Sequence, residues 1–404
     1  MNLTSRMLSK PKAENLKKLN TAVYGCGLSA SGALAIPRFV QSTSSFENEA
    51  PVTAKEARFP KKIPYFHTKS IQHISSGFGF SLFSSDSKLY GSGINNRFQI
   101  GGQLGKCQDY YISAKGIPID GEILQISSGR AHSLILTTEG LFAIGENCFG
   151  QCGNDPEKSQ VSTMNNENRL IPIQIDSEHP ITQIHCALDT SFVITSAGEV
   201  FSFGLNEDGQ CGNGKYGIQW KPSRIHGDAS DVKIRKVSGS TDTILAIDEN
   251  GELFIWGQTE YGQTAGASDD IQLNTSRHIR TSSIGPITTA SSTSTSCIAT
   301  NSKGEVFTWG VGVLGFGPNV EKLATPTNMD QPLFDNKKVS TVFAGNSAMA
   351  ALNENGRLFV WGENRFSSLG LGHEKRQLFP YQLFIPGTVN KVALGPDHSI
   401  FVAY

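Results

Sequence analysis

Residues 126–153 read ISSGRAHSLILTTEGLFAIGENCFGQCG, and this stretch decides the fold. It predicts a loop, a short apolar strand at residues 134–136, a tight turn that ends at Gly140, and a second strand at residues 141–144. The two apolar runs are too short for helices, and the turn between them carries a glycine, so the pattern favours a β-hairpin. A glycine-rich exit from Gly145 to Gly153 follows the hairpin.

The same hairpin recurs along most of the chain. The loop and first strand recur at residues 74–83, 126–136, 184–194, 237–247, 290–300, 342–352 and 392–402, and the second strand recurs at residues 23–27, 89–93, 141–145, 200–204, 253–257, 306–310 and 358–362. The turns between them are marked by Lys88, Gly140, Gly198, Gly251, Gly304 and Gly356, at spacings of 52, 58, 53, 53 and 52 residues. A period near 50 made of strands and glycine turns predicts an all-β fold, a seven-bladed β-propeller with one blade per repeat.

The two ends of the chain complete each other in this count. The second strand at residues 23–27 has no first strand before it, and the first strand at residues 392–402 has no second strand after it. We therefore expect the amino-terminal strand to complete the blade that the carboxyl terminus begins, which removes two exposed sheet edges. Alternating aromatic residues in the second strands, such as Phe254 and Trp256, are expected to be buried between blades.

Composition excludes several classes of function. The 404 residues carry a net charge of −1, so no overall positive field supports binding to nucleic acid, and no DNA partner is expected. The seven cysteines form no C-x-x-C pair and have no histidines at zinc spacing, so neither a metal site nor a cofactor is expected. A P-loop and a nucleophile elbow are absent from the sequence, which predicts a regulator or scaffold rather than an enzyme. No apolar run reaches 18 residues, so no membrane-spanning helix is expected.

The first 20 residues differ from the repeats. Their basic residues outnumber the single acid, Glu14, and are Arg6, Lys10, Lys12, Lys17 and Lys18. This composition is typical of a mitochondrial transit segment, and a disordered basic tail is the alternative. A secretory signal over residues 21–36 is disfavoured, because those residues fit the repeat. We thus expect a targeting segment or tail at 1–20 and a propeller at 21–404, with residues 41–63 forming a long loop and residues 155–169 an inserted one.

The assembled consensus resembles the regulator of chromosome condensation repeat. It runs from a G-x-x-H-S loop through an aromatic-x-Trp-Gly strand to N-x-x-G-Q-x-G, and it is carried by residues 129–133, 145–153, 204–212, 256–257, 309–310 and 361–362. The family forms seven-bladed propellers, so the resemblance implies that fold for residues 21–404. Residues 29–37, 127–134 and 311–319, together with Phe379 and Pro380, look most like mitochondrial members of the family.

The resemblance implies two functions. One is guanine-nucleotide exchange, on a small GTPase for the chromatin member and on an inner-membrane, dynamin-related fusion GTPase for the mitochondrial member. The other is a scaffold in assembly of the mitochondrial large ribosomal subunit, in contact with ribosomal RNA and assembly factors. Both imply a mitochondrial protein, in the matrix or peripherally bound to the inner membrane, whereas a nuclear or cytoplasmic exchange factor is the remaining alternative.

Exchange requires a surface that binds the nucleotide-free GTPase better than the loaded one. Acidic and histidine side chains on the loops of one rim could achieve this by competing for the P-loop lysine or the metal position. The residues that match these loops, with one added arginine, are Arg130, His132, Asp189, Asp242, Asp397 and His398.

A structural role is the alternative for these residues, with the histidines packing at blade edges and the aspartates capping loops. The pattern is also incomplete, because Thr243 replaces a usual histidine and residues 291–296 contain neither Asp nor His. For the RNA-binding alternative, the basic group His373, Lys375 and Arg376 could meet phosphate, although a solvated loop is the simpler interpretation.

Overall fold

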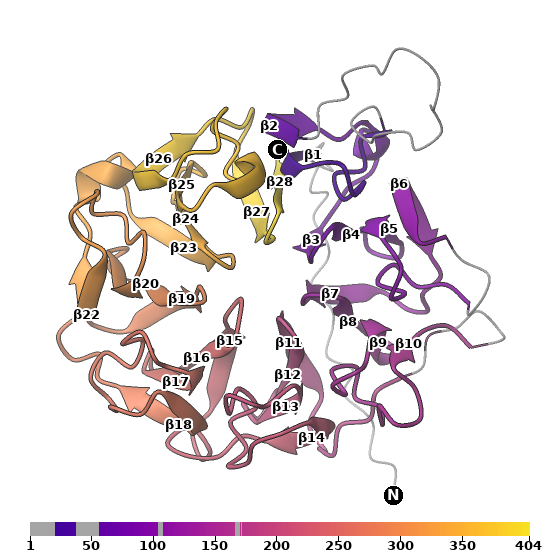
Figure 1. Ribbon diagram of the computed structural model, residues 1–404, viewed down its shortest axis with the longest axis horizontal. Coiled ribbons are helices and arrows are strands. Elements are labelled where there is room, and N and C mark those ends of the chain that lie inside the picture. The colour runs from indigo at the N-terminus through magenta and orange to yellow at the C-terminus, as the bar shows by residue number, and fades with distance from the viewer. Residues whose placement is uncertain (1–20, 38–55, 104–107, 166–169, 171) are drawn as a thin grey trace, which may run out of the picture.

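The computed structural model describes residues 21–37, 56–103, 108–165, 170 and 172–404. In these residues the chain forms seven antiparallel sheets of four strands each, arranged as blades around a common axis (Figure 1). The expected seven-bladed, all-β propeller is confirmed. None of the described helices is long and apolar enough to cross a membrane.

Six blades are built from consecutive strands, which run outward from the axis in chain order. They are β3 (His73–Ser76), β4 (Phe80–Ser84), β5 (Leu89–Ile94) and β6 (Tyr110–Ile117); β7 (Ile123–Ser128), β8 (His132–Thr137), β9 (Gly140–Glu146) and β10 (Val161–Ser162); β11 (Ile181–Ala187), β12 (Thr190–Thr195), β13 (Val200–Gly204) and β14 (Gln219–Arg224); β15 (Ile234–Ser238), β16 (Thr243–Asp248), β17 (Leu253–Gln258) and β18 (Gln272–Ile279); β19 (Ile287–Ser292), β20 (Ser296–Asn301), β21 (Val306–Val311) and β22 (Lys322–Asn328); β23 (Val339–Ala344), β24 (Ala348–Asn353), β25 (Leu358–Gly362) and β26 (Gln377–Leu383). Short 3-10 helices occur at η2 (Pro64–Phe66), η3 (Gln331–Phe334) and η4 (Arg365–Ser367).

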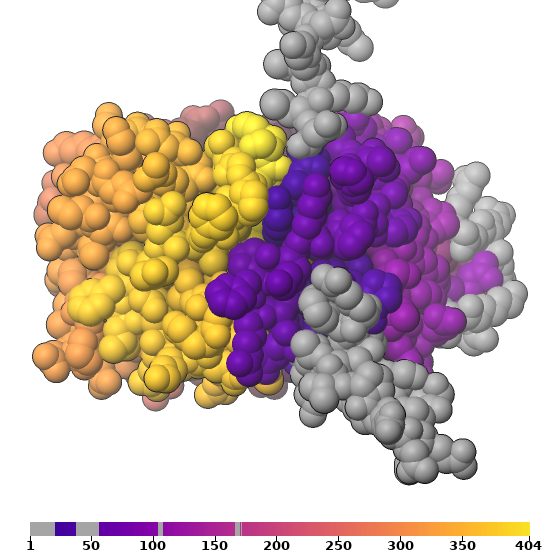
Figure 2. All heavy atoms as spheres, turned by 90° about the horizontal axis from the view of Figure 1, so that it is seen from above, coloured from indigo at the N-terminus to yellow at the C-terminus, as the bar shows by residue number. Residues whose placement is uncertain are grey.

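The seventh blade combines both ends of the described chain. Its strands, from the axis outward, are β27 (Val389–Leu394), β28 (His398–Ala403), β1 (Ala22–Leu28) and β2 (Glu56–Lys62). Strand β1 pairs antiparallel with β28 over six residue pairs, from Ala22 with Ala403 to Gly27 with His398. The amino-terminal segment accordingly lies directly against the carboxyl-terminal one (Figure 2). The expected closure is confirmed, and the basic segment at residues 1–20 lies outside the described residues.

The sequence-based hairpins missed the innermost and outermost strands of each blade. The predicted loop before residue 134 contains strand β7 and the start of β8, and the predicted long loop at 41–63 contains β2. The predicted inserted loop contains β10, while residues 38–55 and 166–169 lie outside the described residues. These strands have no continuous apolar run, and the outermost strands β2 and β14 contain Pro60 and Pro222, a residue that is unusual within strands. Proline is tolerated there because the outer edge of a blade needs no further backbone donors.

A glycine at the end of the third strand fixes the rim loops of every blade. In the blade of β7–β10, Gly145 has φ = 109°, and a Cβ there would lie 2.3 Å from the carbonyl oxygen of Ala131. The next amide, of Glu146, donates to that same oxygen at 2.9 Å. The equivalent loop residues in the next two blades are Asp189 and Asp242, whose carbonyls are held in the same way. The glycine that ends each predicted second strand thus positions the candidate aspartates.

The predicted aromatic core is confirmed between the blades. Trp256, Trp309 and Trp361 are fully buried. The indole Nε1 of Trp256 donates to Gln210 O at 2.8 Å, and that of Trp309 donates to Gln263 O at 2.7 Å, each in the glycine-rich turn of the preceding blade. These bonds join neighbouring blades and hold the glycine-rich turns in place.

Candidate functional site

The loops between the first and second strands of the blades lie on one rim of the ring. Adjacent loops are joined by their backbones: the amide of Arg130 donates to Leu188 O at 2.6 Å, and the amide of Phe78 donates to Arg130 O at 3.1 Å. Because these hydrogen bonds hold the loops close together, side chains from neighbouring blades come into contact.

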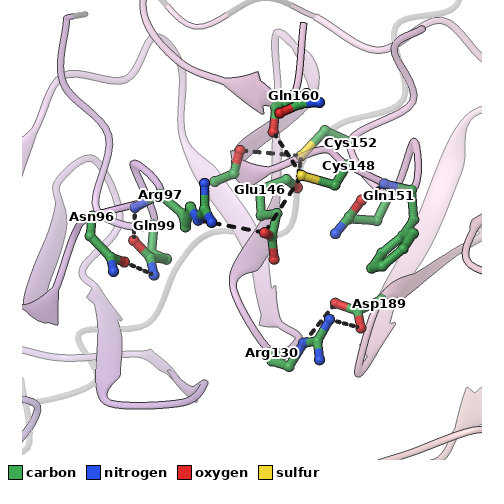
Figure 3. A network of polar contacts seen from close by, with 12 residues as sticks. Asn96, Arg97, Gln99, Arg130, Glu146, Cys148, Gln151, Cys152, Gln160 and Asp189 are labelled. Atoms are coloured by element: carbon green, nitrogen blue, oxygen red, sulfur yellow. Dashed lines mark hydrogen bonds and ion pairs between the residues drawn. The ribbon is translucent and has the colours of Figure 1, made fainter. Parts of the chain in front are cut away.

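Asp189 and Arg130 form a two-pronged ion pair across two blades. Arg130 Nη2 lies 2.6 Å from Asp189 Oδ2, and Arg130 Nε donates to Oδ1 at 3.2 Å (Figure 3). The Asp189 side chain is 3% exposed, whereas that of Arg130 is 43% exposed. Burial raises the pKa of Asp189 to about 6; the Arg130 charge opposes this shift, and Glu146 and Asp242 add to it. The pair therefore combines a buried acid with an arginine that a partner can reach.

Asp242 occupies the equivalent loop of the next blade. It accepts a hydrogen bond of 2.9 Å from Gln210 Nε2. Burial raises its pKa, and the carboxylates of Asp208 and Glu207 raise it further. We call Glu146, Asp189, Glu207, Asp208 and Asp242 the acidic rim.

The two aspartates have different partners although their surroundings repeat. Gln151 and Gln210 occupy the same position in the glycine-rich turn, and each side chain accepts a 2.9 Å bond from the amide two residues before it. Gln210 donates its Nε2 to Asp242, but Gln151 Nε2 is buried and has no partner among the described residues. Asp189, the equivalent acceptor, is instead bound to Arg130 (Figure 3). An unpaired buried amide costs about 1–3 kcal/mol. Gln151 thus keeps an unused donor at the position from which Gln210 bonds the equivalent aspartate.

The two candidate histidines were wrongly expected on loops. His132 and His398 begin strands β8 and β28, and both are completely buried. His132 Nε2 lies 2.9 Å from Ser191 Oγ in the next blade. Because that hydroxyl donates to Gln151 O, it accepts from His132. A partner cannot reach either ring, and the alternative role at the blade edge describes the geometry.

His398 makes the same joint between the closing blade and the first one. Its Nε2 lies 2.7 Å from Ser81 Oγ, and its Nδ1 donates to Asp397 Oδ1 at 2.6 Å. This order of serine, histidine and aspartate is that of a hydrolase triad. Ser81, however, is fully buried between blades, so its oxygen faces no space for a substrate. Asp397 is thereby committed to its own blade, away from the acidic rim.

The remaining candidates add little to the site. Thr243, in the place of a histidine, is buried and donates to Gln258 O at 2.7 Å. In the basic group, Arg376 Nε lies 2.8 Å from Glu363 Oε1, and Glu374 lies between His373 and Lys375 in the chain. Acids therefore offset much of its positive charge.

Sequence reasoning identified Asp189, Asp242 and Arg130, which the structure brings together, but it missed the rest of the acidic rim. Glu146 and Gln210 were regarded only as parts of a glycine-rich turn. The signal that could have identified them is the length of that turn, because a turn of this length folds back and places its polar residues near the loop of the neighbouring blade.

Comparison with known proteins agrees with this architecture. The regulator of chromosome condensation (RCC1) repeat matches residues 139–194, 197–247 and 355–402, and a second form of the repeat matches residues 123–151 and 339–367. The human RCC1-like G exchanging factor-like protein is 36% identical, over 94% of this chain and 86% of that protein. The chain belongs to the RCC1 repeat family.

Other relatives support the same assignment. The mouse RCC1-like G exchanging factor-like protein is 34% identical over 94% of the chain. The crystal structure of human WBSCR16 is similar at a TM-score of 0.87 and 34% identity, covering 95% of this chain and all of that one. Yeast RCC1 (Prp20), bound to Kap60 in its crystal structure, has the same fold with a TM-score of 0.77 at 15% identity, covering 100% of this chain and 95% of that one. The expected family and its propeller are confirmed.

Proposed function

We propose that this RCC1-family propeller is a guanine-nucleotide exchange factor that engages a GTPase through its acidic rim. The observation that carries the proposal is the pair of carboxylates, Asp189 and Asp242, which lie in equivalent loops of neighbouring blades and are close enough that the Asp242 charge raises the pKa of Asp189. The 36% identical relative named as an exchange factor-like protein supports it. The protein is then a regulator without covalent catalysis.

Carboxylates on this face suit the chemistry of exchange. Nucleotide release needs a surface that favours the empty GTPase, and a loaded GTPase presents phosphate where an empty one presents the P-loop lysine. The acidic rim repels phosphate and attracts the lysine, so it binds the empty form more tightly. Arg130 keeps Asp189 charged until a partner cation replaces the guanidinium.

The test is release of labelled GDP from a candidate GTPase by the purified full-length protein. We expect the protein to accelerate release, and Asp189→Ala to slow the accelerated rate about tenfold or more, because a charge-assisted contact contributes about 1.5–3 kcal/mol. The matched control is Asp86→Ala, which removes a carboxylate from the turn between β4 and β5, outside the acidic rim. Equal effects of the two substitutions would refute a role for this face.

We further propose a mitochondrial location, with an inner-membrane, dynamin-related fusion GTPase as the partner. The basic, acid-poor composition of residues 1–20 supports this location. Affinity purification of the tagged protein from mitochondria, with identification of bound protein and RNA, tests it. Recovery of large-subunit ribosomal particles that is lost after RNase treatment would instead favour the ribosome-assembly role. Location of the tagged protein in the nucleus would favour exchange on a small nuclear GTPase.

A further inference from the structure

The axis of the propeller contains a cavity, and Arg130 is the one residue of the proposed exchange site that lines it. It has a volume of about 350 Å³ and is lined by residues of all seven innermost strands, β3, β7, β11, β15, β19, β23 and β27. A single water needs only about 10–15 Å³ measured in this way, so the cavity has room for a small molecule.

The charges that line this cavity are unbalanced. Its lining, which consists of described residues, includes Arg130, His185 and Lys236 but no aspartate or glutamate. Arg130 is already paired with Asp189. His185 is uncharged near neutral pH, because burial lowers its pKa to about 4, and its Nε2 contacts Gly239 O at 2.7 Å. Lys236 is therefore the cation without a counter-charge.

Lys236 is half-buried and has neither a hydrogen bond nor an ion pair to any described residue, and this partial burial lowers the pKa of its ammonium. The neighbouring Arg235 differs completely: its guanidinium donates to the carbonyl oxygens of Asp248, Ile287 and Thr288. An ammonium taken out of bulk water without a partner is costly, so such groups are retained mainly where a ligand supplies the missing charge.

In other blades, the residue at the position of Lys236 bonds the backbone of the next blade. Lys236 is the residue that follows the register shift of the innermost strand, equivalent to Gln125 in β7 and Gln183 in β11. Gln125 uses both ends of its amide to bond Ile184 N and O in the next blade, each at 2.9 Å. Thr289, at this position in β19, accepts a 3.0 Å bond from Val342 N.

In two adjacent blades the residue at this position makes no such bond to the next blade. Gln183 Oε1 is buried without a partner among the described residues, and Lys236 in the next blade also makes no bond. Both residues line the cavity. This sector therefore offers the Lys236 ammonium and the Gln183 side-chain amide, whose NH₂ group can donate a hydrogen bond.

We propose that the sector of the channel between β11 and β15 binds a small oxyanion, a phosphate or a carboxylate, with Lys236 as its counter-charge and Gln183 as a hydrogen-bond donor. The ligand enters along the axis and occupies only part of the cavity. This site is separate from the acidic rim and does not depend on exchange activity.

The experiment titrates the full-length protein with inorganic phosphate and, separately, with succinate at constant ionic strength, using calorimetry and thermal unfolding. We expect saturable binding of at least one anion with a rise in Tm, and a loss of affinity of about tenfold or more in Lys236→Met. Binding of phosphate alone or succinate alone identifies which oxyanion the site takes.

The matched control is Lys391→Met. Lys391 follows the register shift of β27 and is exposed, so this variant removes the same charge from the equivalent position outside the cavity lining. It should bind as the wild type does. Without ligand, Lys236→Met should melt at or above the wild-type temperature, because it removes an unpaired ammonium. Failure of both anions to bind the wild type at about 10 mM, or equal losses in the two variants, would overturn the proposal.

Discussion

Two joints between blades use the same histidine motif but place their aspartates differently. At the closing joint, His398 Nε2 is hydrogen-bonded to Ser81 of the next blade, and its Nδ1 donates to Asp397. At the other joint, His132 reaches Ser191, and its Nδ1 is buried with no partner among the described residues. The aspartate nearest that second joint, Asp189, is bound to the exposed guanidinium of Arg130 instead.

The difference separates architecture from function within one repeat. Where the aspartate bonds its own histidine, it contributes to closure of the ring and its carboxylate is committed to that imidazole. Where an arginine holds it, the acid is buried beneath an exposed guanidinium, which can turn to solvent and let the acid change partners. The repeat motif alone therefore does not identify a functional aspartate; the neighbour that it contacts does.

The largest expected effect comes from breaking the closing joint altogether. Deletion of residues 22–28 removes the buried side chains of Val23, Tyr24 and Cys26 and exposes the edge of β28. Each large apolar side chain contributes about 1.5–3 kcal/mol, and the sum is comparable to the whole stability of a typical domain. We expect loss of the cooperative thermal transition or aggregation on expression. A truncated protein that melts within a few degrees of the intact one would contradict closure by β1.

This closure is also the part of the fold that the sequence predicted best. The repeat count left one unpaired strand at each end, and the glycine and aromatic positions of the central strands supplied their register. The innermost and outermost strands were missed because each is paired on only one side and needs few apolar residues. A role at the blade edge was the alternative for the histidines, but their serine partners were not predicted, because a single repeat cannot show that its histidine contacts a serine of the next blade.

The second expected effect compares the two histidines directly. His398→Ala leaves Ser81 and Asp397 without their ring partner, whereas His132→Ala leaves Ser191 still donating to Gln151 O. Both substitutions also create a cavity. We expect losses of about 2–4 kcal/mol for His398→Ala and about 1 kcal/mol less for His132→Ala, measured by urea unfolding. A larger loss at His132 would show that the Asp397 contact adds nothing to the closing joint.

The third prediction separates stability from exchange. Asp397→Asn weakens the support of His398 and should lower Tm by several degrees, while the exchange rate per folded molecule stays unchanged. Asp189→Asn should slow GDP release about tenfold and change Tm less, because its partner Arg130 can turn to solvent. The reverse pattern would place the functional acid at the closing joint.

The smallest expected effect is a difference in acid sensitivity. Burial and the Arg130 charge lower the pKa of His132 from its ordinary 6.5 to about 3, so below pH 6.5 the unfolded chain takes up a proton that the folded protein does not. His132 therefore makes stability fall as the pH drops from 6.5 toward 3. Asp189 has the opposite sign, because its folded pKa of about 6 lies above the ordinary 3.8, and protonation stabilises the folded state as the pH drops from 6 to 3.8.

Urea unfolding at pH 6.5 and pH 4.5 resolves these two contributions. His132→Gln should reduce the acid-induced loss of stability, and Asp189→Asn should increase it, each by about 1 kcal/mol. Some loss remains in His132→Gln because His185, with a pKa of about 4, acts in the same direction. His132→Gln with an unchanged loss would mean that the ring is protonated inside the fold. Its unpaired Nδ1 would then donate to a group at this joint, and the contrast with His398 would disappear.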